Sequence, residues 1–322
     1  MELEDATKNF DPSYELGDKG FRTVYYSKLK DGREVAVKKL HEHNYNRAKQ
    51  FRNEVEILTK LRHPNLVVMY GCTSRLGHEL LLVYEYVPNG AVADHLHGEK
   101  ANPSLLTWPI RMNIAIETAC ALVYLHASKI IHRDVKTTNI LLDHNFSVKV
   151  ADFGLSRHIS QNVTHVTTAP QGTPGYVDPQ YHRRFQLTDK SDVYSFGVVL
   201  IELISSLVAV DLDRSQDELS LANLALNRIQ RCATDELIDP ILGVGPLESY
   251  GSSQNCQSTQ ECGILLIRIS HKQVVINNSQ SNRVSINYQS HELQSIKTLT
   301  LTKIRPRLLP LTKFLTNFVL AD

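Results

Sequence analysis

The sequence predicts an α+β protein of two lobes, with a small strand-rich lobe followed by a larger helical lobe. Strand-like apolar runs joined by tight turns fill the first third of the chain, and long helical patterns dominate the middle third. The length of 322 residues suits one large two-lobed domain or two ordinary ones. With 42% hydrophobic and 21% charged residues, the composition excludes wholesale disorder.

A β-hairpin is predicted near the start of the small lobe. Apolar runs predict strands over Val24–Leu29 and Glu34–Leu40. The Asp31-Gly32 pair between them is typical of a type I′ turn, which needs positive φ at both central residues.

A helix and two further strands complete the predicted small lobe. The helix runs from about Asn46 to Leu61, and His63-Pro64 ends it. Strands are expected at about Leu66–Tyr70 and Leu80–Tyr86, before a turn at 88–90. The helix should bury three residues at helical spacing: Phe51, Val55 and Leu58.

The larger lobe should be built on two long helices. One opens at Thr107 with Trp108-Pro109 and runs to His126, and the other covers Asp189–Val210. Two short paired strands, 140–142 and 148–150, lie between them in the sequence. The first helix should bury Ile110, Ile114, Leu122 and Leu125.

Several classes of protein are excluded by simple features. The N-terminus has no apolar segment typical of a secretory signal, and the apolar stretch 193–210 is interrupted and too short to span a bilayer. A net charge of +1 does not favour a nucleic-acid binder. No C-x-x-C pair occurs among the five cysteines, so we expect neither a disulfide scaffold nor a zinc site: Cys72, Cys120, Cys232, Cys256 and Cys262.

The character of the chain changes near Gly243. Residues 1–243 carry 27 Lys and Arg against 30 Asp and Glu, whereas 244–322 carry 8 against 4. Ser, Asn and Gln crowd 249–295, and helical periodicity fades. The tail is either a divergent extension or the product of a disrupted reading frame, and we favour the second.

Three short motifs occur in an order and at separations that are informative as a set. VAVK occupies 35–38, HRDVKTTN occupies 132–139 and ADFG occupies 151–154. The set resembles the protein-kinase fold. HRDVKTTNILL, DFGLSR, GTPGYVDP and SDVYSFGVVLIELIS are similar to a plant receptor-like kinase of the Pelle type, above all to the leaf-rust-resistance-locus group, over about 5–242.

The resemblance implies a serine/threonine kinase that uses ATP and Mg2+. Lys38 would neutralise the α- and β-phosphates, held by the carboxylate of Glu54. Asp134 would orient the substrate hydroxyl and accept its proton, and Lys136 would contact the γ-phosphate, as in serine/threonine kinases. The metal ligands would be Asn139 and Asp152.

An adenine pocket and a hinge are implied in the same way. Tyr84 matches the gatekeeper, and Glu85 to Val87 the hinge, whose backbone would bind the adenine edge. Such apolar positions usually belong to the core, and here both roles coincide. The remaining cofactor-binding residues would be Leu16, Gly17, Val24, Ala36 and Leu141. A second apolar stack would be anchored by Asp192 and formed by Leu58, Met69, His132 and Phe153.

An activation segment is expected from Asp152 to about Gln180. Arg133 would form an ion pair with a phosphate on this segment. Thr173 resembles the threonine of the substrate-binding loop that contacts the catalytic base, here Asp134. Surface threonines are ordinarily unmodified, but three in mid-segment are candidate phosphosites: Thr164, Thr167 and Thr168.

Two segments depart from the family pattern. In the glycine-rich loop only Gly17 stands in place, and Lys19 and Arg22 replace glycines that let the backbone approach phosphates. The A-P-E motif reads Asp178-Pro179-Gln180, and the late helices that would partner it are replaced by the tail. We therefore expect an incomplete helical lobe that exposes apolar residues of the 189–210 helix: Leu200, Leu203 and Leu207.

These observations give the following expectations. The chain divides into a flank (1–13), an N-lobe (14–87), a truncated C-lobe (88–243) and a tail (244–322). It is either an active kinase with Ser/Thr protein substrates and an upstream receptor or co-receptor kinase, or a weakly active or inactive pseudokinase that serves as a nucleotide-binding or scaffold module. It would be cytoplasmic, or lie at the cytoplasmic face of the plasma membrane within a longer receptor.

Overall fold

The computed structural model describes residues 2–18, 22–41, 45–73, 79–98, 100–102, 105–160, 163–231 and 233–243. Expectations about Lys19, the last three cysteines and the tail 244–322 lie outside these residues. Within the described part of the chain, no helix has both the length and the apolar character needed to cross a membrane.

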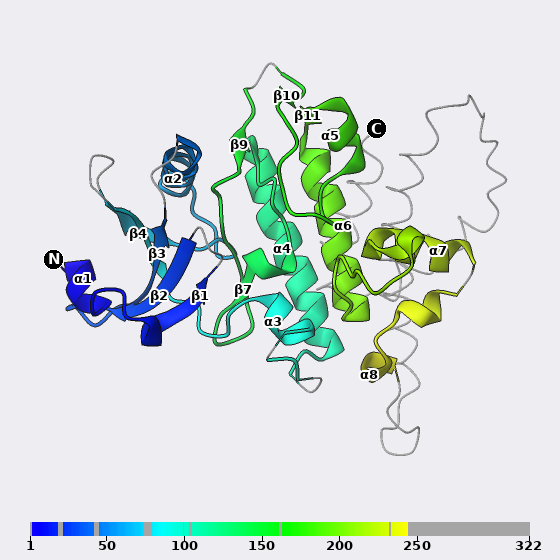
Figure 1. Cartoon of the computed structure of the whole chain (residues 1–322), viewed down its shortest axis with the longest axis horizontal. Coiled ribbons are helices and arrows are strands. Elements are labelled where there is room, and N and C mark those ends of the chain that lie inside the picture. The colour runs from blue at the N-terminus through cyan, green and yellow to red at the C-terminus, as the bar shows by residue number, and fades with distance from the viewer. Residues whose placement is uncertain are drawn as a thin grey trace, which may run out of the picture.

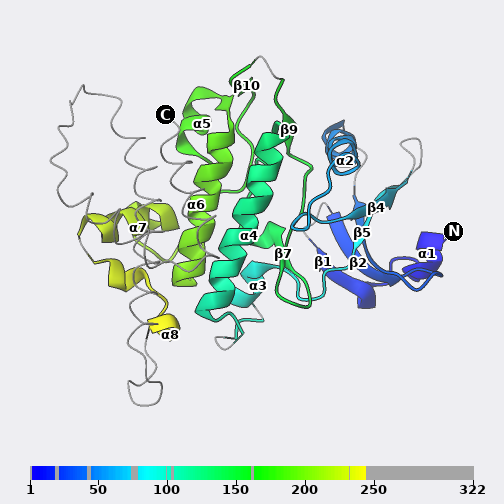
Figure 2. The same ribbon diagram turned by 180° about the vertical axis from the view of Figure 1, so that it is seen from behind.

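A five-stranded antiparallel sheet has the strand order β1-β2-β3-β5-β4. It forms the small lobe at the N-terminal end of the chain (Figures 1 and 2). Its strands are β1 (Glu15–Asp18), β2 (Arg22–Lys28), β3 (Glu34–Leu40), β4 (Met69–Cys72) and β5 (Leu80–Glu85). Sequence patterns predict four of these strands, with β4 displaced toward its C-terminal end. They miss β1 because all four of its residues are exposed and show no apolar alternation.

The turn between β2 and β3 differs from the predicted type I′ turn. The carbonyl of Leu29 accepts the N–H of Gly32, and the N–H of Leu29 donates to the carbonyl of Arg33. These two bonds close a three-residue loop, 30–32. Gly32 has φ of +87°, whereas Asp31 has no positive φ. The loop therefore uses a single left-handed glycine, as three-residue hairpin loops usually do.

The sheet is covered on both faces. Helix α2 (Tyr45–Leu58) packs against one face, where Phe51 and Leu58 are buried. The opposite face carries Val35, Val37, Leu81 and Val83, and the N-terminal flank covers it with Leu3 of α1 (Glu2–Ala6) and with Phe10. Since side chains alternate along β3, Ala36 and Lys38 point away from this flank.

The second lobe is built around two helices, α4 (Trp108–Ala127) and α6 (Asp189–Ser205), which lie side by side (Figures 1 and 2). Shorter helices surround them: α3 (Val92–Leu96), α5 (Pro179–Arg184), α7 (Leu221–Gln230) and α8 (Pro240–Gly243). Three two-stranded sheets complete the lobe: β6 (Ile130–Ile131) with β9 (Arg157–His158), β7 (Ile140–Leu142) with β8 (Val148–Val150), and β10 (Val166–Thr167) with β11 (Gln186–Leu187).

The apolar face of α6 is covered, contrary to expectation. Leu200 and Leu203 are each 2% exposed and belong to the main core, and Leu207 is partly buried against a cluster that includes Leu221 and Leu224 of α7. The sequence patterns do not predict α7, so they do not show that this helix packs over Leu207. Helix α6 also ends at Ser205, before Val210, because Ser206 adopts a left-handed conformation with φ of +55°.

Candidate active site

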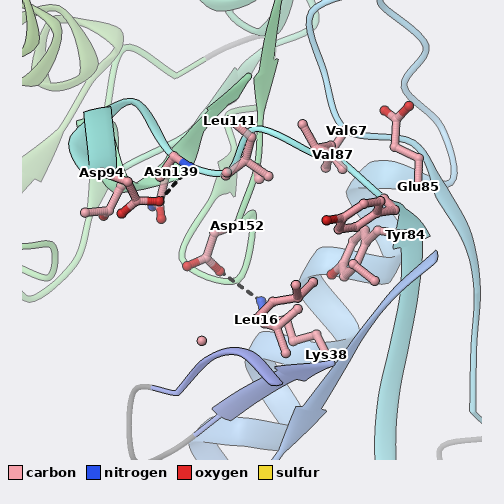
Figure 3. A pocket seen from close by; sticks show the side chains of 18 of the residues that line it. Leu16, Lys38, Val67, Tyr84, Glu85, Val87, Asp94, Asn139, Leu141 and Asp152 are labelled. Carbon is pink, nitrogen blue, oxygen red and sulfur yellow. Dashed lines mark hydrogen bonds and ion pairs between the residues drawn. The ribbon is translucent and has the colours of Figure 1, made fainter. Parts of the chain in front are cut away.

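A cavity of about 470 Å³ lies between the sheet and the helical lobe. This volume falls in the range of about 300–1,000 Å³ that small-molecule sites usually have. All nine predicted cofactor-binding residues line it, and so do Glu54, Asn139 and Asp152 (Figure 3). Segments more than 100 residues apart in sequence therefore meet around one cavity.

A buried network of polar side chains connects β3, α2 and β5. Nζ of Lys38 lies 2.8 Å from Oε2 of Glu54. The other oxygen of Glu54 accepts a 2.6 Å hydrogen bond from the hydroxyl of Tyr84. Burial, followed by the negative charge of Glu54, raises the pKa of Tyr84 well above its usual value, so the phenol remains a donor. Glu54 thus holds the ammonium group of Lys38 within the cavity that both residues line.

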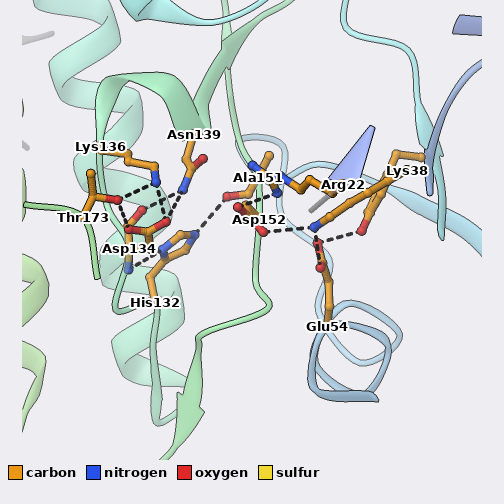
Figure 4. Close-up of polar contacts among 11 residues, drawn as sticks. Arg22, Lys38, Glu54, His132, Asp134, Lys136, Asn139, Ala151, Asp152 and Thr173 are labelled. Carbon is orange, nitrogen blue, oxygen red and sulfur yellow. Dashed lines mark hydrogen bonds and ion pairs between the residues drawn. The ribbon is translucent and has the colours of Figure 1, made fainter. Parts of the chain in front are cut away.

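Four residues of the 134–139 loop and the activation segment form a second polar cluster (Figure 4). Oδ1 of Asp134 accepts the Thr173 hydroxyl at 2.7 Å, and Oδ2 lies 2.7 Å from Nζ of Lys136 and 3.0 Å from Nδ2 of Asn139. Nζ of Lys136 also donates to Thr173 at 2.6 Å. Asp134 is 7% exposed. Its carboxylate is therefore oriented from two sides.

Asp152 stands at the centre of the cleft. Lys38 lies 3.0 Å from its Oδ1, and Nη1 of Arg22 lies 2.6 Å from its Oδ2. Burial raises the pKa of this carboxyl, but attraction to Lys38 and to Arg22 outweighs burial and holds the pKa well below its ordinary value. The residue adopts a left-handed conformation with φ of +69°, which aspartate tolerates better than most residues.

The donor set fits a hard divalent cation. Asp152 and Asn139 both line the cavity and provide the carboxylate and amide oxygens that such ions prefer. Nδ2 of Asn139 donates to the carbonyl of Asp134 at 2.9 Å as well as to its carboxylate, which orients the amide group. The contact between Arg22 and Asp152 is the feature that departs from a plain metal site.

The predicted apolar stack connects the two lobes. Leu58, Met69 and Phe153 are buried in one core, and the ring of His132 meets Phe153 edge-on at a centroid distance of 4.8 Å. Asp192 of α6 anchors its base by accepting the N–H groups of His132 at 2.8 Å and Arg133 at 2.7 Å. The motifs around the cleft therefore rest on the long helix of the second lobe.

Arg133 joins the 132–139 loop to the predicted activation segment. Its guanidinium donates to the Tyr181 hydroxyl and to the carbonyl of Ala169, and Nη2 lies 3.3 Å from the hydroxyl of Thr168. Nη1 is buried without a hydrogen-bond partner. Of the three candidate phosphosites, Thr168 is the one that contacts Arg133, whereas Thr164 bonds His165 and Thr167 lies exposed in β10.

The predicted hinge, residues 85–87, already uses some of its polar groups in contacts with both lobes. Glu85 donates its N–H to the carbonyl of Val68 at 2.9 Å, and its carboxylate accepts the Val68 N–H and pairs with Lys149 at 3.0 Å. Tyr86 donates its N–H to the backbone carbonyl of Glu34 at 3.4 Å. The side chain of Glu85 is therefore engaged by Val68 and Lys149.

Sequence reasoning misses three contributors to this site. The first is the Arg22–Asp152 pair, and the second is the bond from Tyr84, the predicted gatekeeper, to Glu54. The third is Asn53, whose Nδ2 donates to the carbonyls of Phe153, Gly154 and Ser156. Its place next to Glu54 on α2 is the only sequence signal for this role.

This fold and site define a protein kinase, and the chain belongs to that family. The protein tyrosine and serine/threonine kinase family matches it over residues 11–228. Members use ATP and a divalent metal ion and act on protein substrates.

Particular relatives come from Arabidopsis thaliana. Two leaf rust 10 disease-resistance locus receptor-like protein kinase-like proteins, 1.2 and 1.1, are each 68% identical over 242 and 243 residues, or 75% of this chain. Wall-associated receptor kinase-like 14 is 49% identical over 244 residues, also 75% of this chain. These matches cover 37%, 39% and 34% of the relatives, so the chain spans a little over a third of their length.

Proposed function

We propose that the chain is an ATP- and Mg2+-dependent protein serine/threonine kinase that transfers the γ-phosphate to Ser and Thr hydroxyls. The observation that carries this proposal is the cluster of Asp134, Lys136 and Thr173, which contacts the cavity through Asn139, a residue that lines it. An oriented carboxylate beside an ammonium group suits the acceptance of a hydroxyl proton next to a negatively charged phosphate.

In this mechanism each residue has one task. Asp134 orients the substrate hydroxyl and takes its proton, while Lys136 stabilises charge on the transferring phosphate. Lys38, held by Glu54, binds the α- and β-phosphates. Asn139 and Asp152 would hold Mg2+, which supplies charge neutralisation across the phosphates.

The adenine would lie between apolar walls in the same cavity. Leu16, Val24 and Ala36 contribute from the sheet, and Leu141 contributes from β7. Since the N–H groups of Glu85 and Tyr86 are engaged within the small lobe, we assign donation to the adenine edge to the N–H of Val87. Gly17 would let the backbone approach the phosphates.

A second candidate is a pseudokinase that binds nucleotide and serves as a scaffold. The observation that favours it is Arg22, which occupies a glycine position of the phosphate loop and contacts Asp152. Both candidates share the proposed division into an N-lobe (14–87) and a C-lobe (88–243). By analogy with the receptor-like relatives, we propose that the chain acts on the cytoplasmic side of the plasma membrane, downstream of a receptor or co-receptor kinase.

A phosphate-transfer assay on the purified 322-residue chain separates these candidates. With Mg2+ and ATP, Asp134→Asn should lower turnover by roughly two to four powers of ten and leave nucleotide affinity nearly unchanged, because a general base acts mainly in the transition state. Separate Ser, Thr and Tyr peptides as acceptors test the specificity. Equal turnover in the native chain and the variant would overturn the catalytic assignment and favour the scaffold.

A further inference from the structure

Arg22 reaches the centre of the nucleotide cavity from the start of β2. Its Cα pairs in register with Leu40 of β3, and its Nη1 forms a 2.6 Å ion pair with Asp152, 130 residues away in sequence (Figure 4). The two side chains are only 12% and 21% exposed. A largely buried guanidinium therefore lies where the family pattern has a glycine with no side chain.

The pair changes the charge of the site. Asp152 receives Lys38 at one oxygen and Arg22 at the other, and Lys38 also pairs with Glu54. Two carboxylates are thus matched by two fixed cations. Without Arg22, the remaining three side chains (Asp152, Glu54 and Lys38) would carry a net charge of −1. A net negative charge of this kind attracts a divalent cation to a carboxylate.

A guanidinium can perform the electrostatic task of a cation at this position. It is permanently charged, and its planar set of N–H donors binds carboxylates and phosphates alike. The cavity that Arg22 lines also contains Lys38, so incoming phosphates would meet two fixed positive charges next to Asp152.

We propose that, in nucleotide binding, Arg22 supplies the positive charge that a divalent cation at Asp152 ordinarily supplies, so that a nucleoside triphosphate binds this cleft with little dependence on Mg2+. The Mg2+ needed for phosphate transfer would still be held by Asn139 and Asp152. The proposal rests on the nucleotide-binding function proposed above and concerns the binding step, not phosphate transfer. It assigns to Arg22 the control of the metal requirement, which an ordinary kinase leaves to the metal ligands.

Nucleotide titrations of the full chain test this assignment. The dissociation constant of ATP is measured by calorimetry with millimolar Mg2+ and again with excess EDTA, for the native chain, Arg22→Gly and Arg22→Gln. Metal should change the affinity of the native chain by less than about threefold and that of both variants by about tenfold or more, the scale of one charge-assisted hydrogen bond. Arg33→Gln, which removes an exposed arginine paired with Asp31, should behave like the native chain.

The ratio of the two dissociation constants isolates the role of Arg22. A general destabilisation of β2 in a variant would change the dissociation constant of ATP both with Mg2+ and with EDTA, so it would cancel in the ratio. Arg22→Gln retains a side chain and should preserve the strand if Arg22→Gly does not. In a parallel measurement, Mn2+ followed by electron paramagnetic resonance in the presence of ATP should bind Arg22→Gln more tightly than the native chain.

The outcomes distinguish the two proposals. A native chain whose ATP affinity depends on Mg2+ as strongly as that of Arg22→Gln overturns the assignment of Arg22 and leaves the kinase function standing. Failure of every variant to bind ATP in either condition overturns the nucleotide-binding function, and the Arg22 assignment with it.

Discussion

The hydroxyl of Tyr84 and the carboxylate of Glu54 form a buried hydrogen bond of 2.6 Å between β5 and α2. Lys38 holds the other oxygen of the same carboxylate at 2.8 Å. Helix α2 is therefore connected to two neighbouring strands through one side chain that is 2% exposed. Tyr84, the predicted gatekeeper, lines the cavity and also contacts the helix whose Glu54 pairs with Lys38.

Removal of the Tyr84 hydroxyl should weaken this arrangement. Tyr84→Phe should lower the free energy of unfolding by about 1–3 kcal/mol, because a buried charged acceptor loses a donor. Tyr26→Phe is the matched control, since its hydroxyl donates to the carboxylate of Glu34 at 2.7 Å in a solvent-exposed bond between β2 and β3 and should contribute less than about 0.5 kcal/mol. Chemical denaturation measures both, and equal losses would show that the Tyr84 bond has no special role.

The activation segment should respond to phosphate at one threonine. Thr168 lies 3.3 Å from Nη2 of Arg133, whose Nη1 is buried and unpaired. A phosphate there would add nearly two negative charges beside this guanidinium and order the segment. After incubation with an active relative, mass spectrometry should find Thr168 modified and turnover should rise. Thr168→Ala should abolish the rise, whereas Thr164→Ala should not. A rise that survives in Thr168→Ala would assign the control to another residue.

A buried ion pair should stabilise the end of the described C-lobe. Nη2 of Arg111 on α4 lies 2.9 Å from Asp239, and the two side chains are 3% and 6% exposed. Asp239→Ala should destabilise the chain by about 3–5 kcal/mol because it leaves a buried guanidinium without its counter-charge, although the bonds to Leu106, Leu203 and Ser206 remain. Replacement of both partners, Arg111→Met with Asp239→Leu, should recover part of that loss. Thermal unfolding measures the series, and a double variant no more stable than Asp239→Ala would refute the unpaired-charge explanation.

The chain should lose stability in mild acid partly through His63. Burial lowers the pKa of this imidazole below its ordinary value of 6.5, and its Nδ1 accepts the N–H of Asn65 at 3.1 Å. The unfolded chain therefore takes up this proton first, so the stabilising contribution is present above about pH 6.5 and declines as the pH falls toward the folded pKa. His63→Asn keeps an acceptor but cannot titrate. Between about pH 7.5 and about pH 5.5, the free energy of unfolding of His63→Asn should fall less than that of the native chain, as measured by denaturation at each pH. Equal changes would exclude a contribution from His63.

Local patterns predict much of the fold because the relevant physics is local. Apolar alternation predicts β3 over the residues that form it, Glu34–Leu40, and helical spacing predicts that Phe51 and Leu58 are buried. The same patterns fail at β1, where no residue is buried, and at the hairpin turn, where one positive φ suffices instead of two. The short helices α3, α5 and α7 are also missed, and α7 is the helix that covers Leu207.

The sequence by itself determined the family, because three motifs in order are enough to identify a kinase-like chain, and two of the residues it singled out, Lys38 and Asp152, line one cavity. Only the tertiary structure decided what the altered loop does. In the sequence Arg22 is a lost glycine, whereas in the fold it is a cation 2.6 Å from Asp152. A contact across 130 residues depends on how two lobes approach and how far a side chain reaches, and no local pattern carries that information.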